Sequence, residues 1–347
     1  MNDLSIKNVT FVKTVLMVII VFFHSMLFMK GTWFDAIPIQ PEPIPMFICT
    51  WMNSFHVMTF VFVSGYLFHY LKVEQGKYQK FGPFLLNKIK RLLIPYLFVL
   101  FVWVIPIRIA FYGFNFQKIL TDCILGVSPD QLWFILALFI AFIIFYPLTK
   151  LFTKKWSFII ALLFPAISSA GSMYLPDYFQ IWSAFRVAFF FYLGFAFRHS
   201  WEKKLSKVPC FVWVLLNIAL YVGRYLMPND QVVWNAISGL AYYLVTASGC
   251  FMAWFILQKI ATNTQWDKSK TFSYLTKSSM IVYLVHQQLV YVPIYFLYGK
   301  VGNYGLVIIN FIFAFGVSLL IAAIVLRFNV LRFLFGEKKK KTIPKVT

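Results

Sequence analysis

Long apolar runs dominate this sequence and restrict what it can fold into. Of its 347 residues, 61% are hydrophobic and 12% are charged, about half the charged fraction of a typical soluble domain. The run between Lys13 and His24, TVLMVIIVFF, holds no charge at all. About 20 mostly apolar residues cross the hydrocarbon core of a bilayer as a helix. The sequence therefore predicts an all-α fold, a polytopic bundle of transmembrane helices.

Ten segments are long and apolar enough to be candidate spans. The first has no small-residue cleavage site and is too long for a signal-peptide core, so it is expected to be retained. Residues 1–335 form the predicted integral membrane domain, and residues 336–347 form a basic tail. The candidate spans are approximately 10–29, 48–69, 92–112, 131–149, 156–175, 180–198, 208–227, 232–257, 272–297 and 304–326.

The positive charges are distributed unequally between the two sides that ten spans define. An even number of spans puts both termini on the same side of the membrane. All but six of the 32 lysines and arginines lie at the termini or in the loops on that side. Lys30, Lys118 and Lys300 fall on the other side, and three arginines lie inside spans. Cytoplasmic loops are enriched in Lys and Arg, so both termini are predicted to be cytoplasmic. The net charge of +21 is thus an orientation signal, and no nucleic-acid partner is expected.

Six ionisable residues away from the cytoplasmic ends of the predicted spans are candidates for function, because a charge at membrane depth costs at least ~2.5 kcal/mol. At 1.5 Å per residue, His24 lies about 16 Å beyond Lys13, in the outer half of the membrane. His56 is also expected in the outer half, and His286 near the middle. The other three, Arg108, Arg186 and Arg224, come out near the outer ends of their spans, and Arg224 is read as structural.

A polar cavity explains this set better than several unrelated positions, although a single membrane histidine often only bonds a neighbouring helix. Three histidines are able to bind a metal, but no carboxylate lies within a span to complete the site, and the four cysteines show no CxxC spacing. The lack of a carboxylate also argues against proton-coupled transport. A histidine base with an arginine that stabilises negative charge suits acyl transfer to a hydroxyl. Composition alone leaves a binding or export site open.

Five motifs occur in an order that resembles the membrane acyltransferase-3 family, especially its sugar O-acetylase branch (fucose 4-O-acetylase-like and capsular polysaccharide O-acetyltransferases). Lys13 and His24 are similar to that family's Arg-x10-His pair, in which lysine often replaces arginine. The other four segments are SFHVMTFVFVSGY at 54–66, KIKRLLIPY at 88–96, QLWF at 131–134 and IVYLVH at 281–286.

The resemblance implies acetyl-CoA as a co-substrate on the cytoplasmic side, with no resident cofactor or metal, and a polysaccharide or lipid-linked oligosaccharide acceptor near the outer face. It implies a bacterial plasma membrane protein that works in capsule or exopolysaccharide synthesis, among membrane lipids and other biosynthetic proteins. His24 is the expected base or acyl carrier, oriented by His56 and His286. The remaining site residues are a donor-binding set, Lys13, Lys88, Lys90 and Arg91, and a substrate or oxyanion set, Arg108, Gln131, Trp133 and Arg186.

Each of these roles has a plainer alternative. Lys13 and the basic cluster also fit simple anchoring at the membrane surface. Trp133 fits an interfacial tryptophan, and Ser64-Gly65 fits close helix packing better than a nucleophilic serine. For the whole chain, the second hypothesis is a non-enzymatic carrier or exporter of a surface glycan, and the third is a membrane sensor or scaffold.

Overall fold

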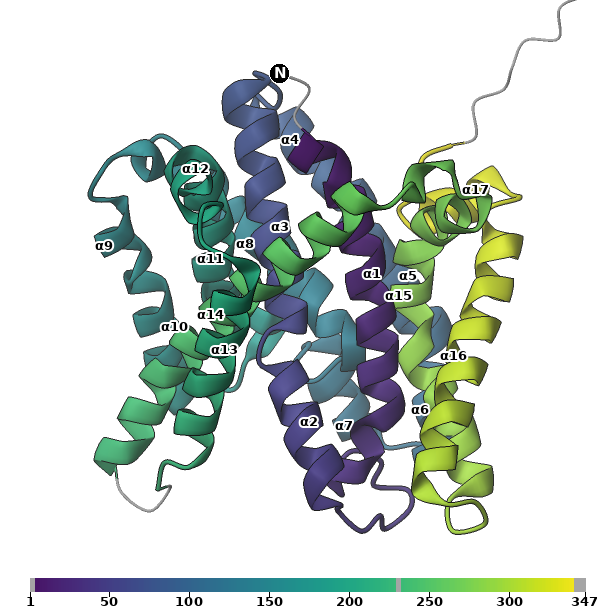
Figure 1. Ribbon diagram of the computed structural model, residues 1–347. Coiled ribbons are helices and arrows are strands. Elements are labelled where there is room, and N and C mark those ends of the chain that lie inside the picture. The colour runs from purple at the N-terminus through teal and green to yellow at the C-terminus, as the bar shows by residue number, and fades with distance from the viewer. Residues whose placement is uncertain (1–3, 229–231, 340–347) are drawn as a thin grey trace, which may run out of the picture.

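A computed structural model describes residues 4–228 and 232–339, and this part of the chain is a helical bundle without strands (Figure 1). The helices are α1 (Leu4–Met26), α2 (Pro43–Asn53), α3 (His56–His69), α4 (Phe81–Lys88), α5 (Ile94–Val99), α6 (Ile105–Tyr112), α7 (Phe116–Lys118), α8 (Trp133–Leu148), α9 (Ser157–Ala161), α10 (Leu163–Tyr174), α11 (Ile181–Ala196), α12 (Glu202–Leu205), α13 (Cys210–Tyr225), α14 (Val232–Asn263), α15 (Lys270–Leu297), α16 (Asn303–Val325) and α17 (Asn329–Leu334).

The predicted fold class is confirmed. Among the described residues, nine helical stretches are long and apolar enough to cross a membrane. The tenth predicted span, 208–227, is α13, which has 16 residues. At 1.5 Å per residue α13 is about 24 Å long, shorter than the ~30 Å hydrocarbon core. It packs along α14 as a shorter apolar helix.

Several predicted spans are interrupted helices. The span expected at 48–69 consists of α2 and α3, which meet at a break over Ser54 and Phe55. The span expected at 92–112 is the end of a helical stretch from α4 to α6, with wide π-helical turns just before Pro95 and Pro106. A proline has no N–H and its ring clashes with the carbonyl four residues earlier, which a wider turn relieves. The helix therefore accommodates Pro95 by a local widening.

Two glycines allow α3 and α11 to pack backbone against backbone. A Cβ atom added to Gly65 would lie 1.9 Å from the carbonyl oxygen of Phe191, and one added to Gly194 would lie 1.8 Å from that of Phe62. Small residues let membrane helices approach this closely. The structural interpretation of Ser64-Gly65 is therefore confirmed, and the hydroxyl of Ser64 bonds the Phe60 carbonyl oxygen of its own helix at 2.8 Å.

The start of α1 and the short helix α17 lie at the same end of the bundle (Figure 1). The end of α1, the start of α2 and the connection from α15 to α16 lie at the opposite end. We call these the terminal end and the distal end. The candidate site residues divide between the two, and the assignment of the terminal end to the cytoplasm stays a prediction.

Candidate functional site

Two histidines that are 262 positions apart in the sequence contact each other where α1 packs against α15. Nδ1 of His24 lies 3.1 Å from Nε2 of His286, and the ring centroids are 4.9 Å apart. His286 is fully buried, whereas His24 is half-buried. We call these two residues the histidine pair. Of the two, only His24 has a partly exposed side chain that a ligand can reach.

Hydrogen-bond partners determine the tautomers of the histidine pair. Nδ1 of His286 lies 3.0 Å and 2.9 Å from the carbonyl oxygens of Val282 and Tyr283. A carbonyl only accepts, so this nitrogen carries the proton and Nε2 of a neutral His286 is an acceptor. Nδ1–H of His24 must then donate to it, and it also faces the Ile20 carbonyl oxygen at 3.0 Å. Nε2 of His24 keeps its lone pair, which no group of the described chain bonds.

His56 borders the histidine pair without bonding it. Its Nδ1–H donates to the Met52 carbonyl oxygen at 2.6 Å, and its Nε2 is buried without a partner among the described residues. The His56 ring lies 4.5 Å from the ring of Phe23, the residue before His24. His56 therefore presents a second unprotonated nitrogen next to the residue that precedes His24.

Gln131 ties the start of α8 to α15, the helix that carries His286. Its amide donates to the Leu284 carbonyl oxygen at 2.6 Å and exchanges two hydrogen bonds with the amide of Gln288, at 2.8 and 2.9 Å. Gln288 also donates to Asp130 at 3.2 Å, and the hydroxyl of Tyr283 donates to the Gln131 carbonyl oxygen. These buried bonds fix the rotation of α15 and thereby the direction of His286.

Arg108 is held by the connection between α6 and α8. Its Nε and Nη2 bond both carboxylate oxygens of Asp130, at 3.0 and 2.9 Å. Nη1 contacts Asp122 at 3.2 Å and the sulfur of Cys123 at 3.7 Å, and Nη2 also donates to the Ser128 carbonyl oxygen. All five N–H groups of the guanidinium are used here, so this geometry leaves none for an oxyanion.

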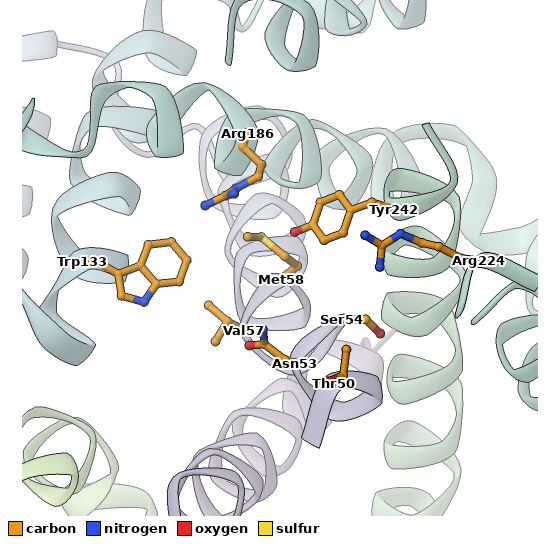
Figure 2. A pocket seen from close by; sticks show the side chains of 9 residues that line it. All are labelled: Thr50, Asn53, Ser54, Val57, Met58, Trp133, Arg186, Arg224 and Tyr242. Atoms are coloured by element: carbon orange, nitrogen blue, oxygen red, sulfur yellow. The ribbon is translucent and has the colours of Figure 1, made fainter. Parts of the chain in front are cut away.

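Arg186 and Trp133 line a separate cavity of about 300 Å³ between α2, α3, α8, α11, α13 and α14 (Figure 2). The guanidinium of Arg186 lies 5.9 Å from the centroid of the Trp133 ring. Arg224, read from the sequence as structural, lines the same cavity. The structure thus brings together one arginine and the tryptophan of the predicted substrate set with a second arginine that the sequence analysis left out of that set.

The predicted donor-binding residues lie toward the terminal end. Lys88 points its ammonium group at the face of Phe142, 3.4 Å from the ring centroid, with Phe84 and Tyr78 nearby at 5.4 and 5.8 Å. The side chain of Lys90 is exposed. The attraction between an ammonium group and the face of an aromatic ring holds the Lys88 side chain in this position.

The first residues of the predicted tail fold back onto this basic end. Nε of Arg91 lies 3.5 Å from the Gly336 carbonyl oxygen. Burial raises the pKa of the Glu337 carboxyl, while the positive charges of Arg91, Arg332 and Lys13 oppose that rise. Lys13 and Arg91 therefore lie close enough to act on one carboxyl. Residues 340–347 of the predicted tail lie outside the described residues.

Sequence reasoning missed a polar network at the terminal end. Nδ1 of His69 lies 3.1 Å from Glu74, and its Nε2 lies 3.1 Å from Nδ1 of His199. Arg198 bonds both carboxylate oxygens of Glu74, at 2.7 and 2.8 Å, and the hydroxyl of Tyr66 at 2.9 Å. No sequence spacing signals this network, because its members come from the ends of α3 and α11.

Within residues 4–228 and 232–339, no group of three His, Cys, Asp or Glu side chains is arranged to hold a metal ion. The four cysteines are free thiols. The histidine pair presents one oriented imidazole nitrogen, Nε2 of His24, as a free acceptor among the described residues.

A family model described as "Acyltransferase domain" matches residues 6–327 of this chain. The match runs from the first turns of α1 to just beyond α16 and so includes both histidines of the pair. No curated protein and no solved structure matches the chain.

Proposed function

Because this chain belongs to the acyltransferase family whose domain covers residues 6–327, we propose that it is a membrane O-acetyltransferase. In this proposal the enzyme transfers an acetyl group from acetyl-CoA to a hydroxyl of a surface polysaccharide or its lipid-linked repeat unit. It acts in a bacterial plasma membrane, with both termini in the cytoplasm. The nine candidate spans and the family membership support a multi-pass membrane acyltransferase, and the donor, the acceptor and the orientation are our proposal.

The observation that carries the proposal is the open nitrogen of His24. Its other ring nitrogen donates to His286, so the tautomer that leaves Nε2 as an acceptor is the favoured one. A base must be unprotonated at the nitrogen that faces its substrate, and histidine is the usual general base near neutral pH. His286, in turn oriented by two backbone carbonyls, is the positioning residue of the pair.

The proposed reaction has two steps. Nε2 of His24 takes the proton of the acceptor hydroxyl as the oxygen attacks the thioester carbonyl carbon of acetyl-CoA. The tetrahedral intermediate then collapses, the carbon–sulfur bond breaks, and the leaving CoA thiolate takes the proton back from His24. The products are the acetyl ester and CoA, and the histidine returns to its initial state. Positive charge develops on His24 between the steps, and a neutral His286 acceptor stabilises it through the Nδ1–H bond.

The terminal end carries basic groups suited to binding the phosphates of the donor. Lys88, Lys90 and Arg91 present three cations on one stretch, and Lys13 lies near Arg91 beside Glu337. Arginine and lysine bind phosphate groups through charge-assisted hydrogen bonds, and CoA carries a pyrophosphate and a 3′-phosphate. α1 joins this end to the histidine pair, since His24 lies 11 positions after Lys13, about 16 Å of helix.

Reconstitution tests this function directly. The full chain is placed in vesicles with radiolabelled acetyl-CoA and a glycan extract, and ester-linked label on the glycan is counted. His24→Ala is expected to lower the transfer rate by about 10²- to 10⁴-fold, the usual contribution of a general base. His199→Ala is the matched control, since His199 also pairs with a histidine but lies in the turn that follows α11, away from the histidine pair. Equal transfer by wild type and His24→Ala would rule out the proposed role.

A further inference from the structure

The cavity shown in Figure 2 carries two arginines and no acid. Arg186 enters it from α11 and Arg224 from α13, and none of the lining residues is an aspartate or a glutamate. Arg108 makes an informative contrast, because it is neutralised by two carboxylates. Within the described part of the chain neither cavity arginine has a carboxylate partner. Asp177 reaches Arg186 only through the hydroxyl of Ser183. Two arginines around one cavity with no directly bonded carboxylate among the described residues create a positive potential that attracts an anion.

Both guanidinium groups keep donors available. Nε of Arg186 is buried with no hydrogen-bond partner among the described residues, and only its Nη2 donates, to Ser183 at 3.1 Å. Nε of Arg224 donates to the Ser238 carbonyl oxygen at 3.0 Å, and no described group bonds its two terminal nitrogens. A buried unpaired donor is unfavourable, and a bound anion would supply the missing acceptor.

The rest of the lining is aromatic and neutral polar. Trp133 lies against Arg186, and the ring of Tyr242 lies 5.6 Å from the guanidinium of Arg224. The hydroxyls of Thr50 and Ser54 donate to carbonyls of their own helix and turn, which leaves their oxygens as acceptors. Cation–π contacts hold the two guanidinium groups. Aromatic rings and hydroxyl oxygens that accept hydrogen bonds are suited to the apolar faces and the hydroxyls of a sugar.

The position of the cavity relates it to the histidines. Ser54 and Val57, which lie on either side of His56, form part of its wall. His56 in turn packs on Phe23, next to His24. A volume of about 300 Å³ is at the lower end for small-molecule pockets, which fits a single sugar residue better than a long glycan segment.

From these contacts we propose that the cavity binds an anionic sugar residue of the acceptor, with Arg186 and Arg224 on its carboxylate or phosphate. This inference rests on the proposed function only where it calls the bound sugar part of the acceptor. The binding itself requires neither acetyl-CoA nor His24. It narrows the substrate class to an acidic glycan.

Equilibrium dialysis of the detergent-purified full chain tests the proposal. The probe is radiolabelled glucuronate, and glucose is the neutral analogue. Wild type is expected to bind glucuronate roughly tenfold more tightly than glucose, and Arg186→Gln and Arg224→Gln each to remove that preference. Arg327→Gln, which removes an exposed arginine outside the cavity, is expected to bind as wild type does. Thermal unfolding of each variant confirms that it is folded. If one of the two arginine variants does not fold, the other still tests the proposal.

Several results would overturn the inference: no preference for glucuronate over glucose, or a preference that survives in both arginine variants. The same holds if phosphatidylglycerol binds in an arginine-dependent manner and glucuronate does not, since the cavity would then be a lipid headgroup site. His24→Ala is expected to bind glucuronate normally. A chain that binds glucuronate through the arginines but transfers no acetyl group refutes the proposed function and leaves this inference standing.

Discussion

Replacing Gly65 by alanine is expected to force α3 and α11 apart. The added Cβ atom would lie 1.9 Å from the carbonyl oxygen of Phe191, and ordinary contact begins at 3.4 Å, so the helices must separate locally by about 1.5 Å. A gap of only 0.5–1 Å already forfeits roughly a quarter to a half of a dispersion contact. The cost should therefore reach the upper end of the usual range for overpacking, about 3 kcal/mol.

The functional consequence follows from what the two helices carry. His56 begins α3 and Arg186 lies on α11, so their separation displaces one histidine and one cavity arginine together. The assay is equilibrium unfolding of the full chain in mixed detergent micelles, followed by tryptophan fluorescence, together with glucuronate binding. Both stability and binding are expected to fall.

Gly223→Ala is the matched control. It lies in α13, where an added Cβ atom meets nothing within 4 Å. Alanine is favoured over glycine inside helices by about 1 kcal/mol, so this variant should be as stable as wild type or slightly more stable. If Gly65→Ala and Gly223→Ala unfold at the same denaturant concentration, α3 and α11 do not pack as closely as described here.

Four further predictions follow. His286→Leu should lower kcat at least about tenfold and leave KM for acetyl-CoA unchanged, whereas His286→Gln restores an acceptor for His24 and recovers part of the rate; equal rates would contradict the positioning role. Arg91→Gln should raise KM for acetyl-CoA roughly tenfold at unchanged kcat, and an unaltered KM would argue against a donor site there. Arg198→Met should cost about 3 kcal/mol in equilibrium unfolding, because it strands a partly buried carboxylate; a neutral result would contradict this. Because burial raises the pKa of Glu337, its neutral form stabilises the fold below the usual Glu pKa, and that stability is lost as pH rises through the raised value. Glu337→Gln should remove this loss in a pH series of unfolding, and parallel curves would refute the assignment.

Hydropathy and charge predicted the helical class and nearly all of the segments, because a run of about 20 apolar residues has few alternatives. They did not predict the break at Ser54–Phe55 or the π-helical turns. These depend on how one helix satisfies its backbone beside another.

The site was predicted less completely, and particular residues show why. Lys13 and His24 share one helix, so their spacing is visible in the sequence. The contact between His24 and His286 depends on the rotation of α15, which Gln131 and Gln288 fix. Arg224 was read as structural because sequence gives depth but not direction, and the cavity depends on which way a side chain points. Arg108 illustrates the reverse: from its depth it was expected to reach a substrate, but groups of the loop outside the spans, two carboxylates among them, bond all of its N–H groups.

The most direct test of the central claim is NMR of the host's surface glycan from strains that express wild type, His24→Ala or His199→Ala. The account predicts that acetyl signals disappear only with His24→Ala, while the amount of exported polymer is unchanged in all three strains. Fully acetylated polymer from the His24→Ala strain would contradict the account. Loss of export together with acetylation would favour a carrier over an enzyme.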